Sequence, residues 1–238
     1  MKKLLFIVLA LVTVSAASAQ DKKKNGGFMN RTGDHLMLQI TNDHWMGAPD
    51  SIKNRMTGIS RGLNVQVLLD QRFKSAPQWS VAFGLGVSTS GMYFKNTVID
   101  LKSKTATLPF RNVDSVDHFK KYKLATAYLE IPLELRFTFK PETENRSIKA
   151  ALGVKVGTLL NVHTKGKLLL DKNGATVNNY IAKETGKGFM NSTRLAATAR
   201  VGYGNFSVVG AYHFTNIFKD GVAPDMKLFQ IGLNFSGL

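Results

Sequence analysis

The segment from Tyr128 to Lys140 alternates strictly between two kinds of side chain. The odd positions from 129 to 139 hold large apolar residues, and the even positions from 130 to 140 hold charged residues, proline or threonine. This period of two predicts a β-strand with one apolar face and one polar face. Such a strand fits a soluble sheet that covers a core. It also fits a membrane barrel whose apolar face contacts lipid, so the rest of the chain must decide.

The first residues have the pattern of a secretory signal. Lys2 and Lys3 precede an apolar run of about 11 residues, and small residues up to Ala19 follow it. The run is too short for a transmembrane helix, which needs roughly 20 residues. We therefore expect three parts: a signal peptide over residues 1–19 with cleavage near Ala19, a flexible periplasmic arm over 20–33, and an outer-membrane barrel over 34–238.

The charge and the cysteine content exclude several classes of protein. The chain has no cysteine, which excludes disulfides and thiol catalysis. Its formal net charge is +16, and in a cytoplasmic protein such a charge would suggest binding of nucleic acid. An exported protein meets no genome, and the chain has no recognition helix or RNA-binding signature. We expect no nucleic acid partner and a basic surface that faces anionic lipid headgroups.

Eight segments alternate with a period of two. They are residues 34–45, 59–73, 79–94, 122–140, 147–163, 189–203, 206–214 and 227–235. The connections between them alternate between long and short. Outer-membrane barrels have this arrangement, with an even number of strands, short periplasmic turns and long extracellular loops. The sequence therefore predicts an all-β fold, an eight-stranded antiparallel up-and-down transmembrane β-barrel.

The connections and the aromatic residues refine this prediction. Two of the four long connections, 95–121 and 164–188, are polar and basic. The first still alternates at 97–101, which indicates a hairpin above the membrane, and the second contains a hairpin-type turn at 171–174. Aromatic residues at both membrane interfaces are typical of such barrels. We expect Phe73, Trp79, Phe139, Tyr203 and Phe206 at the periplasmic interface, and Trp45, Tyr93, Tyr122 and Phe214 at the extracellular one.

The opening stretch also carries a family resemblance. The sequence Tyr-Leu-Glu-Ile-Pro-Leu from Tyr128 resembles a strand of the PorT-like outer-membrane β-barrel family. The similarity covers essentially the whole chain after the signal, including residues 151–160, 197–204 and 229–235. It implies a barrel in the outer membrane of a Gram-negative bacterium. The family name comes from a member linked to a protein-secretion machinery, and we find no motif for that role here.

Charged residues on the polar faces of the strands predict a network inside the barrel. They are Asp70, Arg72, Glu130, Glu134, Arg136, Lys149, Lys155, Arg194 and Arg200. Eight strands leave an interior just wide enough for side chains to fill it. We therefore interpret these residues as a structural network of acids and bases that neutralise one another. Because the bases outnumber the acids, an anionic ligand held in the lumen is the alternative.

No residue pattern indicates a catalytic, cofactor or metal site. Glu130 and Glu134 are four positions apart on a strand, about 13 Å, which exceeds the spacing of glycosidase carboxylates. The neighbouring pairs Asp43–His44 and Asp117–His118 point to opposite strand faces, and the five histidines show no metal-ligand spacing. We expect a protein that is not an enzyme and that has no cofactor.

The expected role is structural, or an interaction through basic extracellular loops. Expected partners are outer-membrane lipids including lipopolysaccharide phosphates, the barrel assembly machinery, and an extracellular or periplasmic protein. Three alternatives stay open: a small-ligand or ion conduit, an outer-membrane enzyme, and an accessory part of a secretion machinery. Within the opening strand, Pro132 has no N–H for the hydrogen-bond ladder. We predict a local bulge or irregular pairing beside it.

Overall fold

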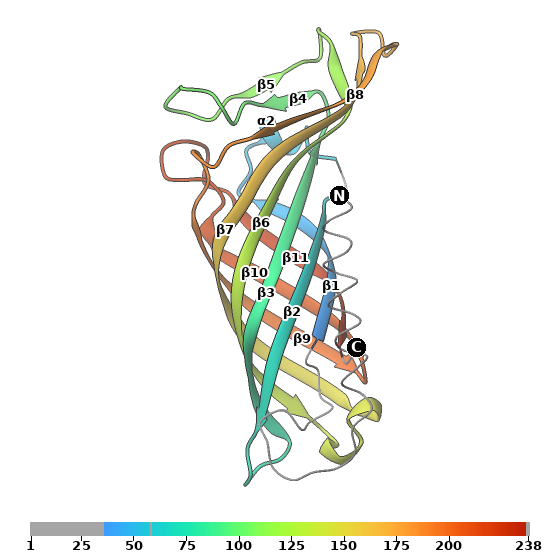
Figure 1. The fold of residues 1–238 in the computed structure, drawn as a ribbon, viewed down its shortest axis with the longest axis vertical. Helices are drawn as coiled ribbons and strands as arrows, with labels where there is room; N and C mark the ends of the chain where they lie inside the picture. Colours follow the sequence, from blue (N-terminus) through green and yellow to red (C-terminus); the bar gives the residue numbers. More distant parts are fainter. Residues whose placement is uncertain (1–35, 58, 237–238) are drawn as a thin grey trace. The chain divides into compact units, whose positions relative to one another are not determined.

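The computed structural model describes residues 36–57 and 59–236, and most of them belong to one closed barrel. Its strands are β1 (Leu36–Met46), β2 (Arg61–Arg72), β3 (Trp79–Phe94), β6 (His118–Thr138), β7 (Ile148–Leu170), β9 (Thr193–Tyr203), β10 (Phe206–Asn216) and β11 (Lys227–Ser236). They are neighbours in the order β6-β3-β2-β1-β11-β10-β9-β7, and pairing of β6 with β7 closes the ring (Figure 1). The predicted eight-stranded antiparallel barrel is confirmed. The predicted signal peptide and arm lie outside the described residues.

The shorter elements lie in the connections. They are the helix α2 (Asp50–Lys53), the hairpin strands β4 (Thr97–Ile99) and β5 (Phe110–Asn112), the 3-10 helix η2 (Pro141–Arg146) and the strand β8 (Thr176–Thr185). No helix in the described part of the chain is both long enough and apolar enough to cross a membrane. The hairpin of β4 and β5 matches the alternation seen at 97–101, so that prediction is confirmed.

The connections sort by length to the two ends of the barrel. Those between β1 and β2, β3 and β6, β7 and β9, and β10 and β11 are long and contain α2, β4, β5 and β8. The turns between β2 and β3, β6 and β7, and β9 and β10 are short. Because strands of an up-and-down barrel alternate in direction, all long connections lie at one end, the upper end in Figure 1. This is the extracellular end in an outer-membrane barrel.

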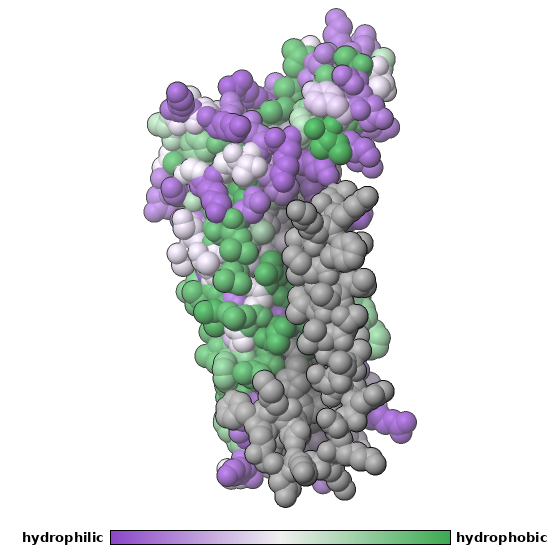
Figure 2. Space-filling view, viewed as in Figure 1, coloured by the Kyte–Doolittle hydropathy of each residue, from purple (hydrophilic) through white to green (hydrophobic). Residues whose placement is uncertain are grey.

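The outer surface of the strands is apolar. Leu152, Val201 and Ile131 have exposed fractions of 67%, 61% and 57%, which would be costly in water and is favourable in lipid. Figure 2 shows hydrophobic side chains over the strands and hydrophilic ones gathered over the end that carries β4, β5 and β8. The alternation in the sequence predicted this division of faces correctly.

Two strands extend further than the sequence indicated. β6 begins at His118 and β7 continues to Leu170, where the sequence analysis placed polar connections. Beyond the barrel, β8 pairs with β7 from Thr185 opposite His163 to Thr176 opposite Leu170. β8 has no second neighbouring strand among the described residues. The connection between β7 and β9 is therefore largely a β-sheet.

The turn between β7 and β8 is the one predicted from residues 171–174. Asp171 Oδ1 accepts hydrogen bonds from the backbone N–H groups of Asn173 and Ala175, both at 2.8 Å. Gly174 has a φ of +89°, a conformation that glycine adopts without the strain a side chain causes. The hairpin prediction is confirmed, and the turn explains why β7 reverses into β8.

Pairing is interrupted beside Pro132, on one side only. Towards β7, Pro132 lies in regular register opposite Lys155. Towards β3, the ladder runs to the pair of Leu133 and Phe83 and resumes at the pair of Glu130 and Gly86, with unchanged register. Irregular pairing beside Pro132 is therefore confirmed, and the alternative of a bulge at that position is wrong. The register shift in β6 lies instead between Ala127 and Tyr128.

Candidate functional site

The middle of the lumen holds an ion-pair group around Glu130 of β6. Its side chain is 1% exposed. Lys155 Nζ of β7 lies 3.4 Å from Oε2, and Arg194 of β9 donates to Oε1 from Nε at 3.1 Å and also from Nη2. Arg194 Nη2 donates to Ser88 Oγ of β3 at 2.9 Å. The Arg194 guanidinium carbon lies 4.0 Å from the ring centroid of Tyr128, a cation–π contact.

Glycines lie on both sides of Glu130, and Gly157 makes room for this group. Glu130 lies in register between Gly86 of β3 and Gly157 of β7, and Gly157 is in turn opposite Arg194. A Cβ on Gly157 would lie 3.0 Å from Glu130 Cγ, which is closer than ordinary packing allows. The absence of a side chain lets Arg194 cross β7 to reach the carboxylate, so the small residues belong to the site.

A second ion-pair group surrounds Glu134, which lies further along β6 towards the periplasmic end. Glu134 Oε2 accepts from Arg136 Nε at 3.0 Å and from Arg200 Nη2 at 3.1 Å. Arg136 Nη1 also lies 3.8 Å from Asp70 Oδ1 of β2. All four side chains are largely buried. Each lumen glutamate therefore holds two bases, which offsets the cost of removing these charges from water.

The remaining predicted lumen residues lie near the periplasmic end. Arg72 Nη1 donates to the backbone carbonyl of Pro141 at 3.2 Å. Lys149 is buried on the lumen face of β7. Arg72 and Lys149 thus lie closer to the periplasmic end than the two ion-pair groups. The structure brings the other seven predicted residues into those two groups: Asp70, Glu130, Glu134, Arg136, Lys155, Arg194 and Arg200.

The sequence analysis missed a polar chain above Glu130. Asp43 Oδ1 accepts from Thr41 Oγ1 at 2.7 Å and from Gln230 Nε2 at 2.8 Å. Gln230 Oε1 lies 3.2 Å from His213 Nε2, and both side chains are buried. In the sequence analysis, Asp43 was considered only as the neighbour of His44. Its odd position, shared with Thr41 on the inward face of β1, was the signal that could have placed it inside.

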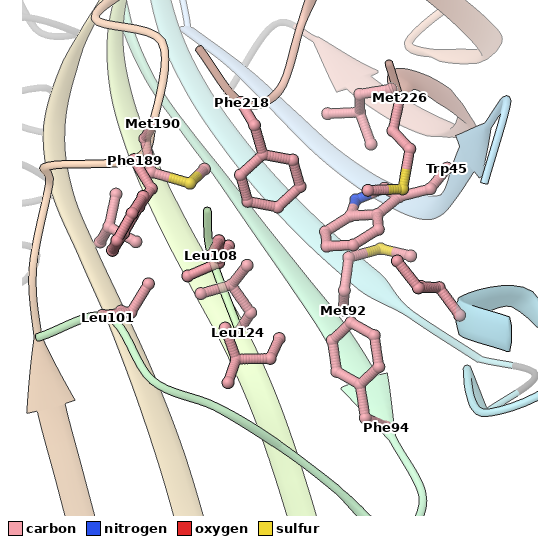
Figure 3. Packing of buried hydrophobic residues seen from close by; sticks show 14 of the residues in the cluster. Trp45, Met92, Phe94, Leu101, Leu108, Leu124, Phe189, Met190, Phe218 and Met226 are labelled. Atoms are coloured by element: carbon pink, nitrogen blue, oxygen red, sulfur yellow. The ribbon is translucent and has the colours of Figure 1, made fainter. Parts of the chain in front are cut away.

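The extracellular mouth of the lumen is closed by an apolar plug. Its buried members are Trp45, Ile52, Met92, Phe94, Ile99, Leu101, Leu108, Tyr122, Leu124, Val162, Phe189, Met190, Phe218, Met226 and Leu228. The strand tips supply some of them and the long connections supply the others, and Figure 3 shows how they converge. The long connections are therefore not fully exposed to solvent, because part of each one packs over the mouth of the barrel.

Aromatic contacts and hydrogen bonds hold the plug together. The Trp45 ring meets Phe94 and Phe218 edge to face, each at 5.5 Å between centroids. The Tyr122 hydroxyl donates to Ile99 O at 3.0 Å and accepts from Ile99 N at 2.9 Å, which fastens β4 to β6. The prediction that Trp45 and Tyr122 lie at the membrane interface was wrong. Both side chains point into the barrel at the strand tips, where they are buried against side chains of the long connections.

In the part of the chain that the structure describes, the space between the plug and the ion pairs is small. A cavity of about 20 Å³ lies between Trp45, Tyr128, Arg194 and His213, which is space for roughly one water molecule. A larger hollow of about 230 Å³ lies outside the barrel, between Arg55, Phe94 and Phe110. Among the described residues, the cavity between the ion pairs and the plug is therefore too small for an organic ligand.

Arg55 at that outer hollow fastens the connection between β3 and β6. It donates to Asn96 O at 3.1 Å and to Asn112 Oδ1 at 2.8 Å, and its Nη2 lies 3.0 Å from Asp114 Oδ2. The hydrogen bond from Arg55 is the main cause that lowers the pKa of Asp114 below its ordinary value. Arg55 thus anchors the loop that supplies Leu101 and Leu108 to the plug.

Comparison with known proteins identifies the family. Residues 25–220 match the family model of the outer membrane protein beta-barrel domain. The chain belongs to this family. As an outer membrane beta-barrel protein, it is located in the outer membrane, and its apolar strand faces contact lipid. The expected periplasmic aromatics (Phe73, Trp79, Phe139, Tyr203 and Phe206) are all exposed on the barrel, as is Phe214 near the other end.

Solved structures of other barrels show distant similarity, and no curated protein matches the chain. The crystal structure of Ail, the attachment invasion locus protein of Yersinia pestis, has a TM-score of 0.35 and 12% identity, over 85% of this chain and 97% of that one. Its complex with the heparin analogue sucrose octasulfate gives 0.34 and 13%, with the same coverage. A mutant of Rh. blastica porin gives 0.17 and 7%, over 85% of this chain and 98% of that one.

Proposed function

We propose that this outer-membrane barrel does not conduct solutes and acts as an interaction protein through its basic extracellular region. The observation that carries the proposal is the double closure of the lumen. The groups around Glu130 and Glu134 fill its middle, and the plug around Trp45 and Phe218 fills its mouth. A conduit would need a continuous polar path, and a lumen binding site would need a cavity larger than one water molecule.

The charge of the extracellular connections supports an interaction with anionic partners. Residues 95–121 contain six lysines and arginines against three aspartates, and residues 164–188 contain five lysines against two acids. Such a surface attracts phosphate-bearing lipids and acidic proteins. We infer that outer-membrane lipids and an extracellular protein are partners, and that the barrel assembly machinery inserts the chain.

Conductance tests the closed lumen. The purified chain, refolded into a planar lipid bilayer, should give no current steps above the background of protein-free membranes. A heat-dependent shift in gel mobility would verify that the inserted chain is folded. Regular single-channel steps from the folded barrel would contradict the proposal and favour the conduit.

Crosslinking in living cells tests the interaction role. A photoreactive residue replacing Lys104 or Lys172, both exposed on extracellular turns, should capture a cell-envelope partner. The same residue replacing Glu142, exposed in the periplasmic turn, is the matched control. Capture from the periplasmic position alone would move the interaction to the other side of the membrane and refute this part of the proposal.

We also infer that the protein is not an enzyme. Among the described residues, no three histidine, aspartate or glutamate side chains gather in a group that could hold a metal ion. Asp43 and His213 are buried inside the barrel and are linked through Gln230. An unchanged envelope lipid composition after deletion of the gene is the expected result, and a missing lipid modification would contradict it.

The finer relationship to the PorT-like branch of outer-membrane barrels is also a proposal. The strand sequence Tyr-Leu-Glu-Ile-Pro-Leu from Tyr128 supports it. A secretion role has no such support, since no residue motif for it occurs. Normal protein secretion in a deletion strain is therefore the expected outcome, and a secretion defect would assign the chain to that machinery.

A further inference from the structure

Five lysines share one face of the sheet that extends beyond the barrel. Lys123 of β6, Lys165 of β7 and Lys183 of β8 lie directly opposite one another in register. Lys121 and Lys167 form the next row. Residues in register point to the same face, with Cβ atoms about 4.5–5.5 Å apart. We call Lys121, Lys123, Lys165, Lys167 and Lys183 the lysine face.

In the part of the chain that the structure describes, none of these five lysines forms a salt bridge with an acid. The only acid of β8, Glu184, is in register with Thr164 on the opposite face and accepts from Lys102 N at 3.0 Å. Lys123 Nζ lies 5.4 Å from the ring centroid of Tyr93, which does not neutralise it. Like charges directly opposite each other destabilise a sheet. An anion bound on this face would offset this repulsion.

The height of the lysine face above the membrane identifies the kind of anion. The same face of β6 carries the lipid-exposed Leu129 and Ile131 further down. Lys123 is 16 residues from Phe139, the exposed aromatic residue at the periplasmic end of the same face. This separation is about 53 Å along the strand and about 37 Å along the membrane normal at a tilt of roughly 45°, which exceeds the hydrocarbon thickness of about 30 Å. The lysines therefore lie beyond the hydrocarbon core. Their long side chains can reach down to headgroups, as lysines at interfaces do.

We propose that the lysine face binds the phosphate groups of a glycolipid headgroup in the outer leaflet. Ammonium groups on flexible stems bind phosphate oxygens as point charges. Two rows of lysines across three strands offer several such groups to a headgroup that bears more than one phosphate. The proposal deepens the interaction role proposed above and rests on it, because it names the partner's chemistry and the residues that bind it.

The test compares two triple variants of the full-length folded barrel in detergent. One carries Lys123→Gln, Lys165→Gln and Lys183→Gln. The matched control carries Lys53→Gln, Lys74→Gln and Lys219→Gln, which removes the same charge from exposed positions outside the basic connections 95–121 and 164–188. Native mass spectrometry measures the binding of bisphosphorylated lipid A, of dephosphorylated lipid A, and of the soluble anion inositol hexakisphosphate. A heat-dependent gel shift verifies folding.

The wild type and the control should prefer bisphosphorylated over dephosphorylated lipid A. The lysine-face variant should lose this preference, by about fivefold for each lysine neutralised. A lysine-face variant that keeps the preference, or a control that loses it equally, would overturn the proposal. Loss of inositol hexakisphosphate binding with unchanged lipid A binding would also overturn it, because the site would then serve a soluble anion.

The thermal stability of the barrel gives a second readout, which is independent of the binding measurement. Without anionic lipid, Lys165→Gln should raise the midpoint temperature of the gel shift, because it removes repulsion from Lys123 and Lys183. With bisphosphorylated lipid A, the wild type should have the higher midpoint temperature and Lys165→Gln the lower one. If Lys165→Gln still had the higher midpoint with this lipid, the result would count against the site. Conductance separates the two proposals: a closed barrel without lipid preference refutes only the lysine face, whereas a conducting barrel refutes the proposed function.

Discussion

The ion-pair groups and the apolar plug fill the same lumen in opposite ways. The groups around Glu130 and Glu134 come from strands alone, and their hydrogen bonds are directional. The plug joins strand tips to long connections through contacts such as that of Trp45 with Phe218, which depend on shape rather than direction. Ion pairs across β6, β7 and β9 thus favour one strand register, whereas the plug attaches the long connections to the strand tips.

The largest expected effect is the loss of the carboxylate at the centre of the ion pairs. Glu130→Gln leaves Lys155 and Arg194 buried without their counter-charge, and breaking a buried pair costs about 3–5 kcal/mol. We expect the free energy of unfolding, measured by urea titration in detergent, to fall by that amount. The exposed Glu142→Gln is the control and should change it by less than about 0.5 kcal/mol. A small effect at Glu130 would mean that the pairs do not define the barrel.

A somewhat smaller effect is expected in the plug. Phe218→Ala removes a ring that is 1% exposed, and truncation of a buried phenylalanine costs about 3–5 kcal/mol. We expect the lower end, about 3 kcal/mol, because loops can settle into the space better than strands can. Exchange of amide hydrogens should increase in the connections and stay low in the barrel strands.

The same variant separates the two closures functionally. With Phe218→Ala the mouth is opened while the groups around Glu130 and Glu134 remain, so planar bilayers should still show no conductance. Current steps from this variant would show that the plug alone keeps the barrel closed. Phe218→Leu, which keeps most of the volume, is the control and should resemble the wild type.

The two regions also differ in how far the sequence predicts them. Alternation in β6, β7 and β9 places Glu130, Lys155 and Arg194 on inward faces, because a period of two leaves one choice once the lipid face is known. The pairing of each acid with its bases depends on the register between neighbouring strands. The alternation of residues within one strand does not predict that register. Gly157 lies between Glu130 and Arg194 only because β7 is in that register.

The plug could not be predicted from periodicity. Leu101, Met190 and Phe218 lie in irregular connections, where no repeat assigns a face to each side chain. Their burial depends on contacts between segments far apart in the chain. A weaker signal was present, since large apolar residues are unusual in loops that are only solvated. The positions of Trp45 and Tyr122 were predicted wrongly for the same reason. An aromatic residue at the end of a barrel strand fits a membrane interface in the sequence, and only the folded loops show that it is buried.

A moderate effect is expected where a hydrogen bond joins a loop to the barrel. Tyr122→Phe removes the hydroxyl that bonds both the N–H and the carbonyl of Ile99. Each lost bond that leaves a buried backbone group without a partner costs about 1–3 kcal/mol. Hydrogen exchange at the Ile99 amide should accelerate accordingly, while global unfolding changes less. Equal loss of global stability would mean that β4 unfolds together with the barrel.

The smallest expected effect concerns the salt bridge that anchors the plug's loop from outside. The pKa of Asp114 is lowered in the folded protein, chiefly by its hydrogen bond from Arg55, relative to the ordinary value of 3.8. The stabilisation is therefore fully present above that ordinary value and is lost as the pH falls through the lowered folded value. Limited proteolysis in the 95–117 connection should increase over this acidic range. Asp114→Asn should be cleaved more readily at neutral pH and should lose part of this pH dependence. A pH response identical to that of the wild type would show that the loop is held by the plug alone, without help from Arg55.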